Sequence, residues 1–329
     1  MFLSKGTMHV TSQYSKRKFS GAICALDCDR FERRYILGCT ENGFFFSYDV
    51  YMSQEVFYGC IPSNSILTDV KWSTTNPKMF AVSSYDTNLR VYDSSKLEQP
   101  IYEYPFGSKI HSCTFNPKSP IIAASMELGL TRIIDIREKA NLNALRALIP
   151  NEITNTRWIP DSEYAVICGD EIGNIYLFDI RKPEEPYQFN WWKQKVLIDD
   201  DNSPAHESGI IGLCFTENNR HFYSMDKKGT IRMWNVDDGL SAFVQYQLKE
   251  PAKYPRNLEI DTFNGDLFVP ESNRIRNLNK SELFVGHAKD VVSISSFDDG
   301  IATGGCDSFL CIWRSDYEDE IYDVSDWSD

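Results

Sequence analysis

Only a few residues of this chain have the types and spacing needed for bond chemistry. Ser224, His206 and Asp226 are the residue types of a nucleophilic triad, in which a histidine takes the serine proton and an aspartate orients the imidazole. A triad is defined by geometry, however, and the same residues are suited to hydrogen bonding between strands and in turns. We therefore interpret them as structural. The chain lacks the motifs GxSxG, HExxH, GxxxxGK[ST] and GxGxxG, so we expect a binding protein and not an enzyme.

The nine cysteines are potential zinc ligands or disulfide partners. No CxxC pair occurs, and most cysteines lie in apolar, strand-like runs, such as SCTF around Cys113 and LCF around Cys214. Free cysteine in such a run behaves as a small buried apolar residue. We expect reduced, buried thiols, no metal site and no cofactor.

Two arginines occupy equivalent positions after separate strand-like segments. Arg181 ends the tetrapeptide Phe178-Asp179-Ile180-Arg181, and Arg137 ends Ile134-Asp135-Ile136-Arg137. A solvated arginine that pairs with a local carboxylate contributes little to stability. At a protein interface an arginine is often a hot spot. Both interpretations apply to each arginine alone, whereas the repeated placement favours a binding role for the pair.

Charge and composition exclude several classes of protein. The net charge is −13, and residues 315–329, SDYEDEIYDVSDWSD, carry seven acidic groups and no basic one. This balance argues against direct nucleic-acid binding and against anionic membrane surfaces. No apolar run approaches the length of a membrane-spanning helix, and the start, MFLSKGTMHV, lacks the apolar region of a secretion signal. We expect 315–329 to be a disordered acidic tail.

A repeat of strand-like segments organises residues 19–314. An apolar residue followed by a polar one recurs at steps of 44, 42, 44, 56, 44 and 35 residues. Within each step, short alternating runs rich in Val, Ile, Phe and Tyr are separated by Gly, Asn, Asp and Pro. Four strands in about 40–45 residues are typical of a propeller blade. The sequence predicts an all-β fold, a seven-bladed β-propeller with four antiparallel strands per blade. The recurring polar residues are Asp49, Asp93, Asp135, Asp179, Asn235, Asn279 and Arg314.

The ring also needs closure, because an open ring exposes edge strands. The acidic tail cannot supply the fourth strand of blade seven, so we assign this role to the alternating residues 7–13 within the N-terminal segment 1–18. An insertion at 189–205 accounts for the long step. Its Trp191 and Trp192 are expected to begin an outer strand, with a hydrophobic contact for a partner as the alternative.

The repeats resemble those of WD-repeat propellers. The similarity is clearest in SSYDTNLRVYD (83–93), GTIRMWN (229–235) and GHAKDVVSI through ATGGCDSFLCIW (286–313). It implies a buried hydrogen-bonded tetrad in the last blade, made of His287, Thr303, Asp307 and Trp313. Blade five keeps a tetrad histidine and tryptophan but has Lys228 where the aspartate is expected. Blade six, about 251–285, matches least.

A closer resemblance comes from the two arginine tetrapeptides, which are similar to a motif of WD-repeat substrate receptors of cullin–RING ubiquitin ligases. RRYILGCTENGFFFSYD (33–49), RHFYSMDKKGTIRMWN (220–235) and the opening Phe2-Leu3-Ser4 resemble the Cockayne syndrome A family of such receptors. That resemblance implies docking to the damaged-DNA-binding adaptor protein, which bridges receptor and cullin, through Arg137, Arg181, Asp179, Phe2 and Leu3.

The same resemblance implies a nuclear role in transcription-coupled nucleotide-excision repair. The implied targets are stalled-polymerase repair factors such as the Cockayne syndrome B remodeller. We expect them on the opposite face, which carries turns 85–88, 226–229 and 305–308. The alternative is a generic WD-repeat scaffold of a chromatin or RNA-processing assembly, in which the arginines are incidental.

Overall fold

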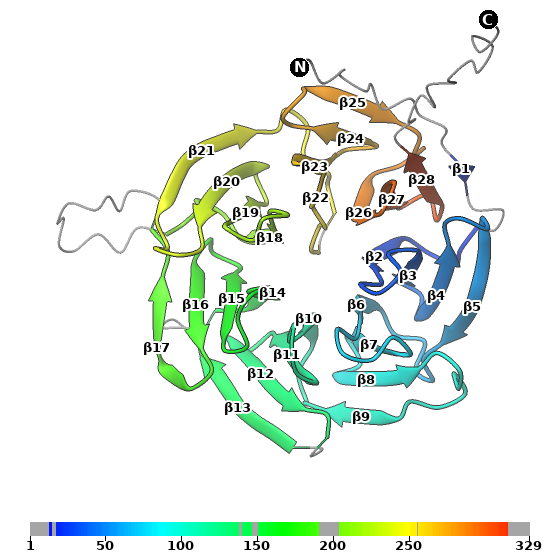
Figure 1. The fold of residues 1–329 in the computed structure, drawn as a ribbon, viewed down its shortest axis with the longest axis horizontal. Helices are drawn as coiled ribbons and strands as arrows, with labels where there is room; N and C mark the ends of the chain where they lie inside the picture. Colours follow the sequence, from blue (N-terminus) through cyan, green and yellow to red (C-terminus); the bar gives the residue numbers. More distant parts are fainter. Residues whose placement is uncertain are drawn as a thin grey trace, which may run out of the picture.

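The protein forms a closed ring of β-sheets. The computed structural model describes residues 13–14, 18–137, 140–146, 151–190, 204–254 and 256–314. They build seven four-stranded antiparallel sheets around a central axis (Figure 1). The predicted all-β, seven-bladed propeller is therefore confirmed. Among these residues no helix is long and apolar enough to cross a membrane.

The blades follow one another along the chain, and each runs from an inner to an outer strand. Blade one contains β2 (Ile23–Cys28), β3 (Tyr35–Thr40), β4 (Phe44–Asp49) and β5 (Gln54–Cys60), and blade two contains β6 (Leu67–Trp72), β7 (Met79–Ser84), β8 (Asn88–Asp93) and β9 (Tyr102–Pro105). Blade three contains β10 (Ile110–Phe115), β11 (Ile121–Met126), β12 (Leu130–Asp135) and β13 (Ala140–Arg146), and blade four contains β14 (Ile153–Trp158), β15 (Ala165–Asp170), β16 (Ile175–Asp179) and β17 (Lys182–Gln188).

The remaining blades follow the same order. Blade five contains β18 (Ile210–Phe215), β19 (His221–Asp226), β20 (Thr230–Asn235) and β21 (Ser241–Gln247). Blade six contains β22 (Asp261–Phe263), β23 (Asp266–Glu271), β24 (Arg274–Asn277) and β25 (Glu282–Val285). Blade seven contains β26 (Val291–Phe297), β27 (Gly300–Gly305), β28 (Leu310–Arg314) and β1 (Gln13–Tyr14).

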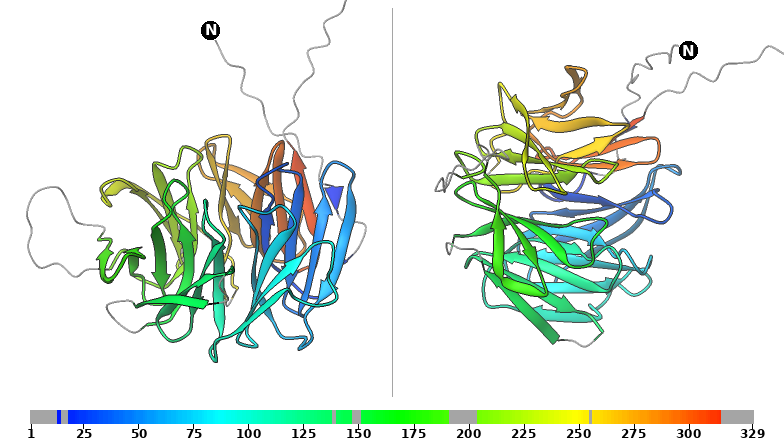
Figure 2. Two further views of the ribbon diagram at one scale, coloured as in Figure 1. Left: turned by 60° about the horizontal axis from the view of Figure 1, so that its bottom comes forward. Right: turned by 60° about the vertical axis from the view of Figure 1, so that its left-hand side comes forward.

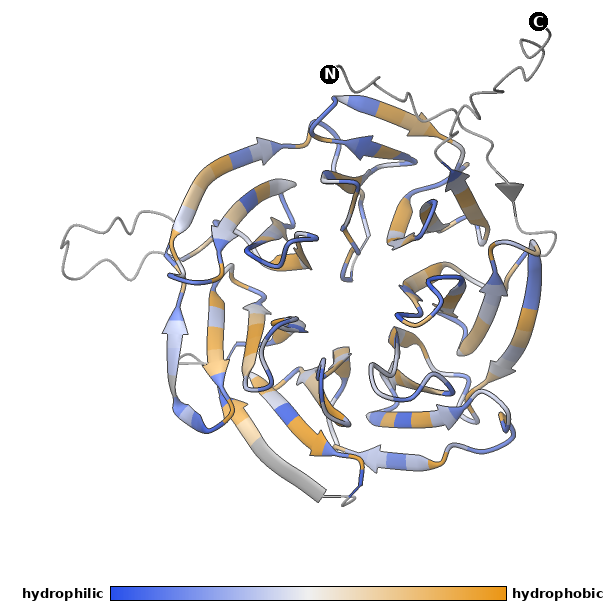
Figure 3. Ribbon diagram, viewed as in Figure 1, coloured by the Kyte–Doolittle hydropathy of each residue, from blue (hydrophilic) through white to orange (hydrophobic). Residues whose placement is uncertain are grey.

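Burial follows the position of a strand in its blade. Every residue of β6 is buried, whereas β21 alternates between exposed and partly buried residues over most of its length. In Figure 3, hydrophobic and hydrophilic residues alternate along β5 and β21. Inner strands are covered on both faces by neighbouring blades, and outer strands keep one face in water. The side views in Figure 2 show that the strands run obliquely from one face of the ring to the other.

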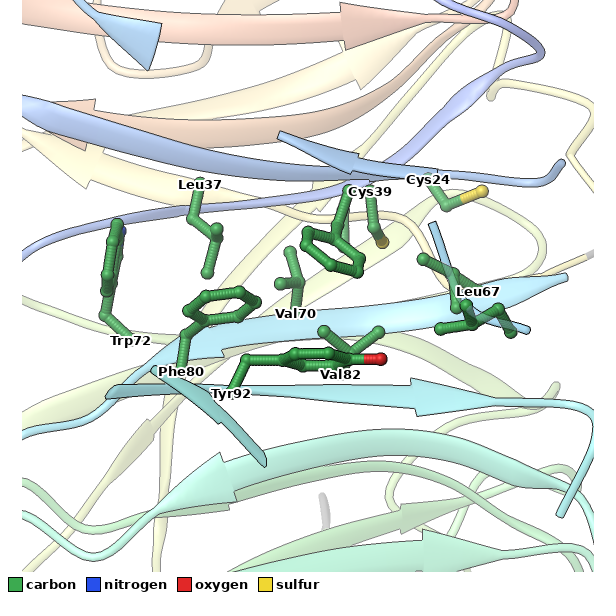
Figure 4. Close-up of a cluster of buried hydrophobic side chains, with 12 residues drawn as sticks. Cys24, Leu37, Cys39, Leu67, Val70, Trp72, Phe80, Val82 and Tyr92 are labelled. Atoms are coloured by element: carbon green, nitrogen blue, oxygen red, sulfur yellow. The ribbon is translucent and has the colours of Figure 1, made fainter. Parts of the chain in front are cut away.

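The hydrophobic core lies between neighbouring blades. Between blades one and two, Phe80 stacks on Tyr92 with ring centroids 5.5 Å apart and meets Trp72 edge-on at 5.7 Å (Figure 4). Phe45 of blade one lies 4.9 Å from the Tyr92 ring. Full burial of one such side chain is worth about 1.5–3 kcal/mol. Apolar packing between adjacent blades therefore stabilises the ring.

The N-terminal segment closes the ring. Gln13 pairs with Ile312, and Tyr14 pairs with Cys311 of β28. Of the residues 7–13 predicted for this strand, only Gln13 lies within the described part of the chain. Phe19, which follows this strand, contacts both ends of the ring. Its backbone N–H donates to the Ser308 carbonyl of blade seven at 2.9 Å, and its ring stacks on Phe46 of blade one with centroids 3.9 Å apart.

The third strand of blade six ends at Asn277, not at the predicted Asn279. The Asn277 Oδ1 accepts the backbone N–H of Asn279 at 3.1 Å and that of Lys280 at 3.2 Å. Asp135 and Asp179 accept the N–H two residues ahead in the same way. Asn277 thus makes the same turn hydrogen bond as these aspartates, although no aromatic residue precedes it.

Candidate functional site

Arg181 is held by the aspartate that ends its own strand. The Arg181 Nε and Nη2 atoms donate to Asp179 Oδ1 and Oδ2 at 2.9 and 2.6 Å, and the Arg181 backbone N–H donates to the same carboxylate at 2.9 Å. The hydrogen bond from Arg181 lowers the pKa of Asp179. The Arg181 Cζ also lies 4.2 Å from the centre of the Tyr164 ring. One edge and one face of the guanidinium are therefore oriented, while 61% of the side chain remains exposed.

Arg137 repeats this geometry one blade earlier. Its Nε donates to Asp135 Oδ1 at 3.1 Å, and its Nη2 donates to Asp135 Oδ2 at 2.6 Å. The Arg137 side chain is 65% exposed, whereas that of Asp135 is only 6% exposed. Asp135 is thus more shielded from water than Asp179, which is 37% exposed.

The two ion pairs lie on the same face of the ring. Each follows the third strand of its blade, and the sheets β10-β11-β12-β13 and β14-β15-β16-β17 have the same strand order. On this face the Asn116 side chain also donates to the Glu163 carbonyl at 2.8 Å, which links the two blades. We call it the arginine face. The turns 85–88, 226–229 and 305–308 lie at the other ends of their strands, on the opposite face.

A third arginine–aspartate pair on the arginine face was not anticipated from the sequence. In blade one, Arg34 donates from Nε and Nη2 to Asp49 at 2.9 and 2.5 Å. Asp49 occupies the same strand-ending position as Asp135 and Asp179. Arg34, however, comes from the turn that follows β2, so no tetrapeptide motif marks it. The repeated aspartate at the strand end was the available signal.

Phe2 and Leu3 lie outside the described residues, as do Trp191, Trp192 and the acidic tail 315–329.

The tetrad predicted in blade seven is assembled. His287 Nε2 lies 2.9 Å from Thr303 Oγ1, which also accepts the indole N–H of Trp313 at 2.8 Å. His287 Nδ1 lies 3.1 Å from each carboxylate oxygen of Asp307. Burial is the largest single influence on the pKa of Asp307 and raises it, but the hydrogen bond and charge of His287 and the backbone N–H groups of Ala288 and Phe309 together lower it, and the net shift is downward. These buried contacts tie three strand regions of one blade together.

Blade five contains a tetrad too, which corrects the expectation based on Lys228. His206 Nε2 lies 2.6 Å from Ser224 Oγ, and the Trp234 indole N–H donates to the same oxygen at 2.8 Å. The acidic partner is Asp226, at the end of β19, with its Oδ2 3.4 Å from His206 Nδ1. Lys228 instead pairs with Glu207 at the surface. Because Asp226 comes two positions earlier than the family pattern requires, a residue-by-residue comparison overlooks it.

The blade five tetrad brings together the residues of the candidate triad, but it does not form an accessible site. The His206 side chain is 0% exposed, and Ser224 is equally buried. Burial lowers the pKa of His206 and favours its neutral form. Since Ser224 Oγ already accepts the Trp234 indole N–H, the arrangement holds strands together and leaves no room for a substrate carbonyl.

The cysteines are free thiols in the structure. Cys24, Cys39, Cys113, Cys168, Cys214 and Cys311 are buried. Over the described ranges, no group of three or more His, Cys, Asp or Glu side chains is arranged to hold a metal ion.

Comparison with known proteins bears on this geometry. The family model described as "WD domain, G-beta repeat" matches residues 279–314, which span β25 and the three strands of blade seven from β26 to β28. The last blade is thus similar to a WD repeat, and the matched residues include His287, Thr303, Asp307 and Trp313.

Distant relatives cover about half of the chain. Radiation-sensitive protein 28 of Saccharomyces cerevisiae is 23% identical over 207 residues, covering 54% of this chain and 41% of the relative. DDB1- and CUL4-associated factor 13 of Danio rerio is 27% identical over 159 residues, covering 47% and 32%. GATOR2 complex protein WDR59 of Homo sapiens is 23% identical over 178 residues, covering 53% and 17%. The chain thus spans less than half the length of each of these relatives.

Proposed function

We propose that this protein is a substrate-receptor subunit of a cullin–RING ubiquitin ligase and docks on the damaged-DNA-binding adaptor protein through its arginine face. The observation that carries the proposal is the pair of identical ion pairs, Arg137 with Asp135 and Arg181 with Asp179, on neighbouring blades. Both guanidinium groups are oriented and exposed. The similarity to DDB1- and CUL4-associated factor 13 supports this assignment.

The physical role of the aspartates is to orient each arginine before binding. An arginine held on one edge by a carboxylate loses less rotamer freedom when a partner binds. The exposed part of such a guanidinium can donate to carbonyl or carboxylate groups of the adaptor, and charge-assisted hydrogen bonds of this kind are strong. The receptor itself then performs no bond chemistry. It brings a target to the ligase and raises the effective concentration of target lysines near the ubiquitin carrier.

We further propose that the ligase acts in transcription-coupled nucleotide-excision repair in the nucleus, as the resemblance to the Cockayne syndrome A family implies. The similarity to Radiation-sensitive protein 28, whose name refers to radiation sensitivity, supports a repair role. Targets such as the Cockayne syndrome B remodeller would bind the opposite face. Phe2 and Leu3 would add to the adaptor contact.

Binding of the purified adaptor to the full chain tests the proposal. Arg181→Ala is the cleaner probe, because Asp179 is partly exposed and tolerates loss of its partner. We expect at least tenfold weaker adaptor binding with an unchanged melting temperature. Arg137→Ala should weaken binding similarly, but it also removes two side-chain hydrogen bonds from the buried Asp135 and is expected to lower stability. Lys228→Ala, which removes an exposed cation from the opposite face, is the matched control and should bind as wild type.

A generic scaffold is the second candidate function, and the match to a component of the GATOR2 complex favours it. In that case the arginines serve only their own aspartates. Undiminished adaptor binding by Arg181→Ala, or no adaptor binding by the wild-type chain, would support the scaffold and contradict the receptor.

A further inference from the structure

A cavity of about 490 Å³ enters the centre of the ring from the arginine face. Its rim is formed by the turns that follow the first strands of several blades and includes Asp29, Pro117, Pro160 and Glu217. First and third strands run in the same direction, so these turns lie at the same end as Arg137 and Arg181. The volume is within the range of about 300–1,000 Å³ that is typical of ligand pockets.

The floor of the cavity is a cluster of charged side chains from distant parts of the chain. Lys71 Nζ lies 2.8 Å from Glu259 Oε1 and 3.1 Å from Asp69 Oδ1. Arg157 lies farther away, 3.7 Å from Asp69 and 3.8 Å from Glu259. Asp27 completes the cluster, with Oδ1 3.9 Å from Lys71 Nζ. Three carboxylates thus face two cations.

Glu259 enters this cluster because the connection from β21 to β22 runs through the ring centre. The Leu26 N–H donates to Glu259 Oε2 at 2.6 Å, and the Glu259 N–H donates to the Val292 carbonyl at 3.0 Å. On the same connection, Asn257 donates to the Thr154 carbonyl. The cavity floor is therefore built from buried bonds among several blades, which fix its shape.

Two of the three carboxylates are fully engaged. Asp69 accepts from Lys71 and from the backbone N–H groups of Val70 and Cys113, at 2.8 and 3.1 Å. Glu259 accepts from Lys71 and Leu26. Asp27 differs, because its Oδ2 accepts the Trp72 N–H at 2.7 Å while its Oδ1 has only the long contact with Lys71.

Asp27 is also the carboxylate that the cavity reaches. Its side chain is 27% exposed, against 5% for Asp69 and 9% for Glu259, and the exposed part lies inside the cavity. Burial there raises the pKa of Asp27 despite the attraction of Lys71. Burial likewise raises the pKa of Glu259 to about 7. In both cases burial is the largest cause, because it disfavours the ionised carboxylate, and the charge of Lys71 opposes the shift.

The rim carries charges of both signs. The Asp29 carboxylate accepts hydrogen bonds from the backbone N–H groups of Glu32, Arg34 and Tyr35. Arg30 and Arg33 are exposed cations at the entrance. Because they are exposed, solvent screens them, whereas the excess negative charge at the floor is buried and screened less.

We propose that this cavity binds an organic cation, a guanidinium or ammonium group, with Asp27 Oδ1 as the principal acceptor. Because the cavity opens on the arginine face, the cation can come from a lysine or arginine side chain of the protein that docks there, or from a free polyamine. The binding step itself does not depend on the identity of the docking protein, and it is tested with the isolated chain.

The test is calorimetric titration of the full chain with four probes: N-acetyl-arginine methylamide, its neutral citrulline analogue, N-acetyl-glutamate methylamide and spermidine. The arginine probe should bind at least tenfold more tightly than the citrulline probe, which has nearly the same shape without the charge. A preference for spermidine over the arginine probe identifies a free polyamine as the source, and the reverse identifies a protein side chain. Equal binding of the citrulline probe, or tighter binding of the glutamate probe, overturns the proposal.

Variants locate the site. Asp27→Asn should abolish the preference for the charged probe while keeping an acceptor for the Trp72 N–H. Glu98→Gln, which removes an exposed carboxylate outside the cavity lining, is the matched control and should bind like wild type. An Asp27→Asn protein that folds and still prefers the charged probe contradicts the assignment. If that variant fails to fold, the comparison of arginine and citrulline on the wild-type chain still decides the proposal.

Discussion

Arg34 and Asp49 of blade one form the same two-point ion pair that joins each exposed arginine to its aspartate in blades three and four. The arginine comes from fifteen residues before the aspartate, whereas Arg137 and Arg181 come two residues after theirs. The Arg34 side chain is 27% exposed, and Asp49 is 5% exposed. The same arginine–aspartate ion pair thus occurs once with a mostly buried arginine and twice with an exposed one.

Arg34→Ala is expected to destabilise the fold, because it leaves the buried Asp49 carboxylate without its main partner. The melting temperature should fall by about 2 °C or more. Arg181→Ala, whose aspartate is partly solvated, should melt like wild type. Differential scanning calorimetry of both variants checks the contrast. Equal melting temperatures for the two would show that burial of the aspartate does not matter.

Thr303→Val should destabilise blade seven. The substitution keeps the shape of the side chain but removes the oxygen that accepts the Trp313 indole N–H and contacts His287. An unsatisfied buried donor costs about 1–3 kcal/mol. Urea unfolding gives the loss directly, and Ser224→Ala should have a similar effect in blade five. The exposed Thr75→Val provides the control, with little change expected.

Phe80→Ala should be the most damaging of the single substitutions considered. Phe80 is 0% exposed and contacts Trp72 and Tyr92 in the core between blades one and two. Removing such a ring leaves a cavity and costs about 3–5 kcal/mol. Phe31→Ala, at a side chain that is 50% exposed, should stay within about 0.5 kcal/mol of wild type. The free energy of unfolding in urea distinguishes the two.

Stability should fall as the pH drops below about 6.5, the ordinary pKa of histidine. Burial lowers the pKa of His206 in the folded protein, although Asp226 opposes that shift and Arg232 adds to it. The unfolded chain therefore binds the histidine proton first, which favours unfolding. The contribution is fully present above 6.5 and is lost as the pH falls toward the folded pKa. Urea midpoints at pH 7.5 and 5.5 measure it. His206→Asn should show a smaller pH dependence, and an unchanged dependence would contradict this origin.

Much of the fold could be predicted because its signals are local. The alternation of apolar residues and the turn residues at Asp49, Asp135 and Asp179 repeat within each blade, and both depend on neighbours a few positions away. The blade seven tetrad was predictable as well, since its four residues match a family pattern. Blade six and the Asp226 partner were misplaced by two residues, where the spacing departs from that pattern.

The chain by itself therefore determined seven blades, their strand order and two arginines at matching strand ends. Only the tertiary structure decided that Arg34 meets Asp49, and that Asp27, Lys71 and Glu259 share one buried cluster. Arg34 and Asp49 belong to one blade but lie fifteen residues apart, and Asp27, Lys71 and Glu259 come from three distant parts of the chain. Closure of the ring brings side chains of different blades into contact at its centre, and no local sequence pattern records which of them then face the same cavity.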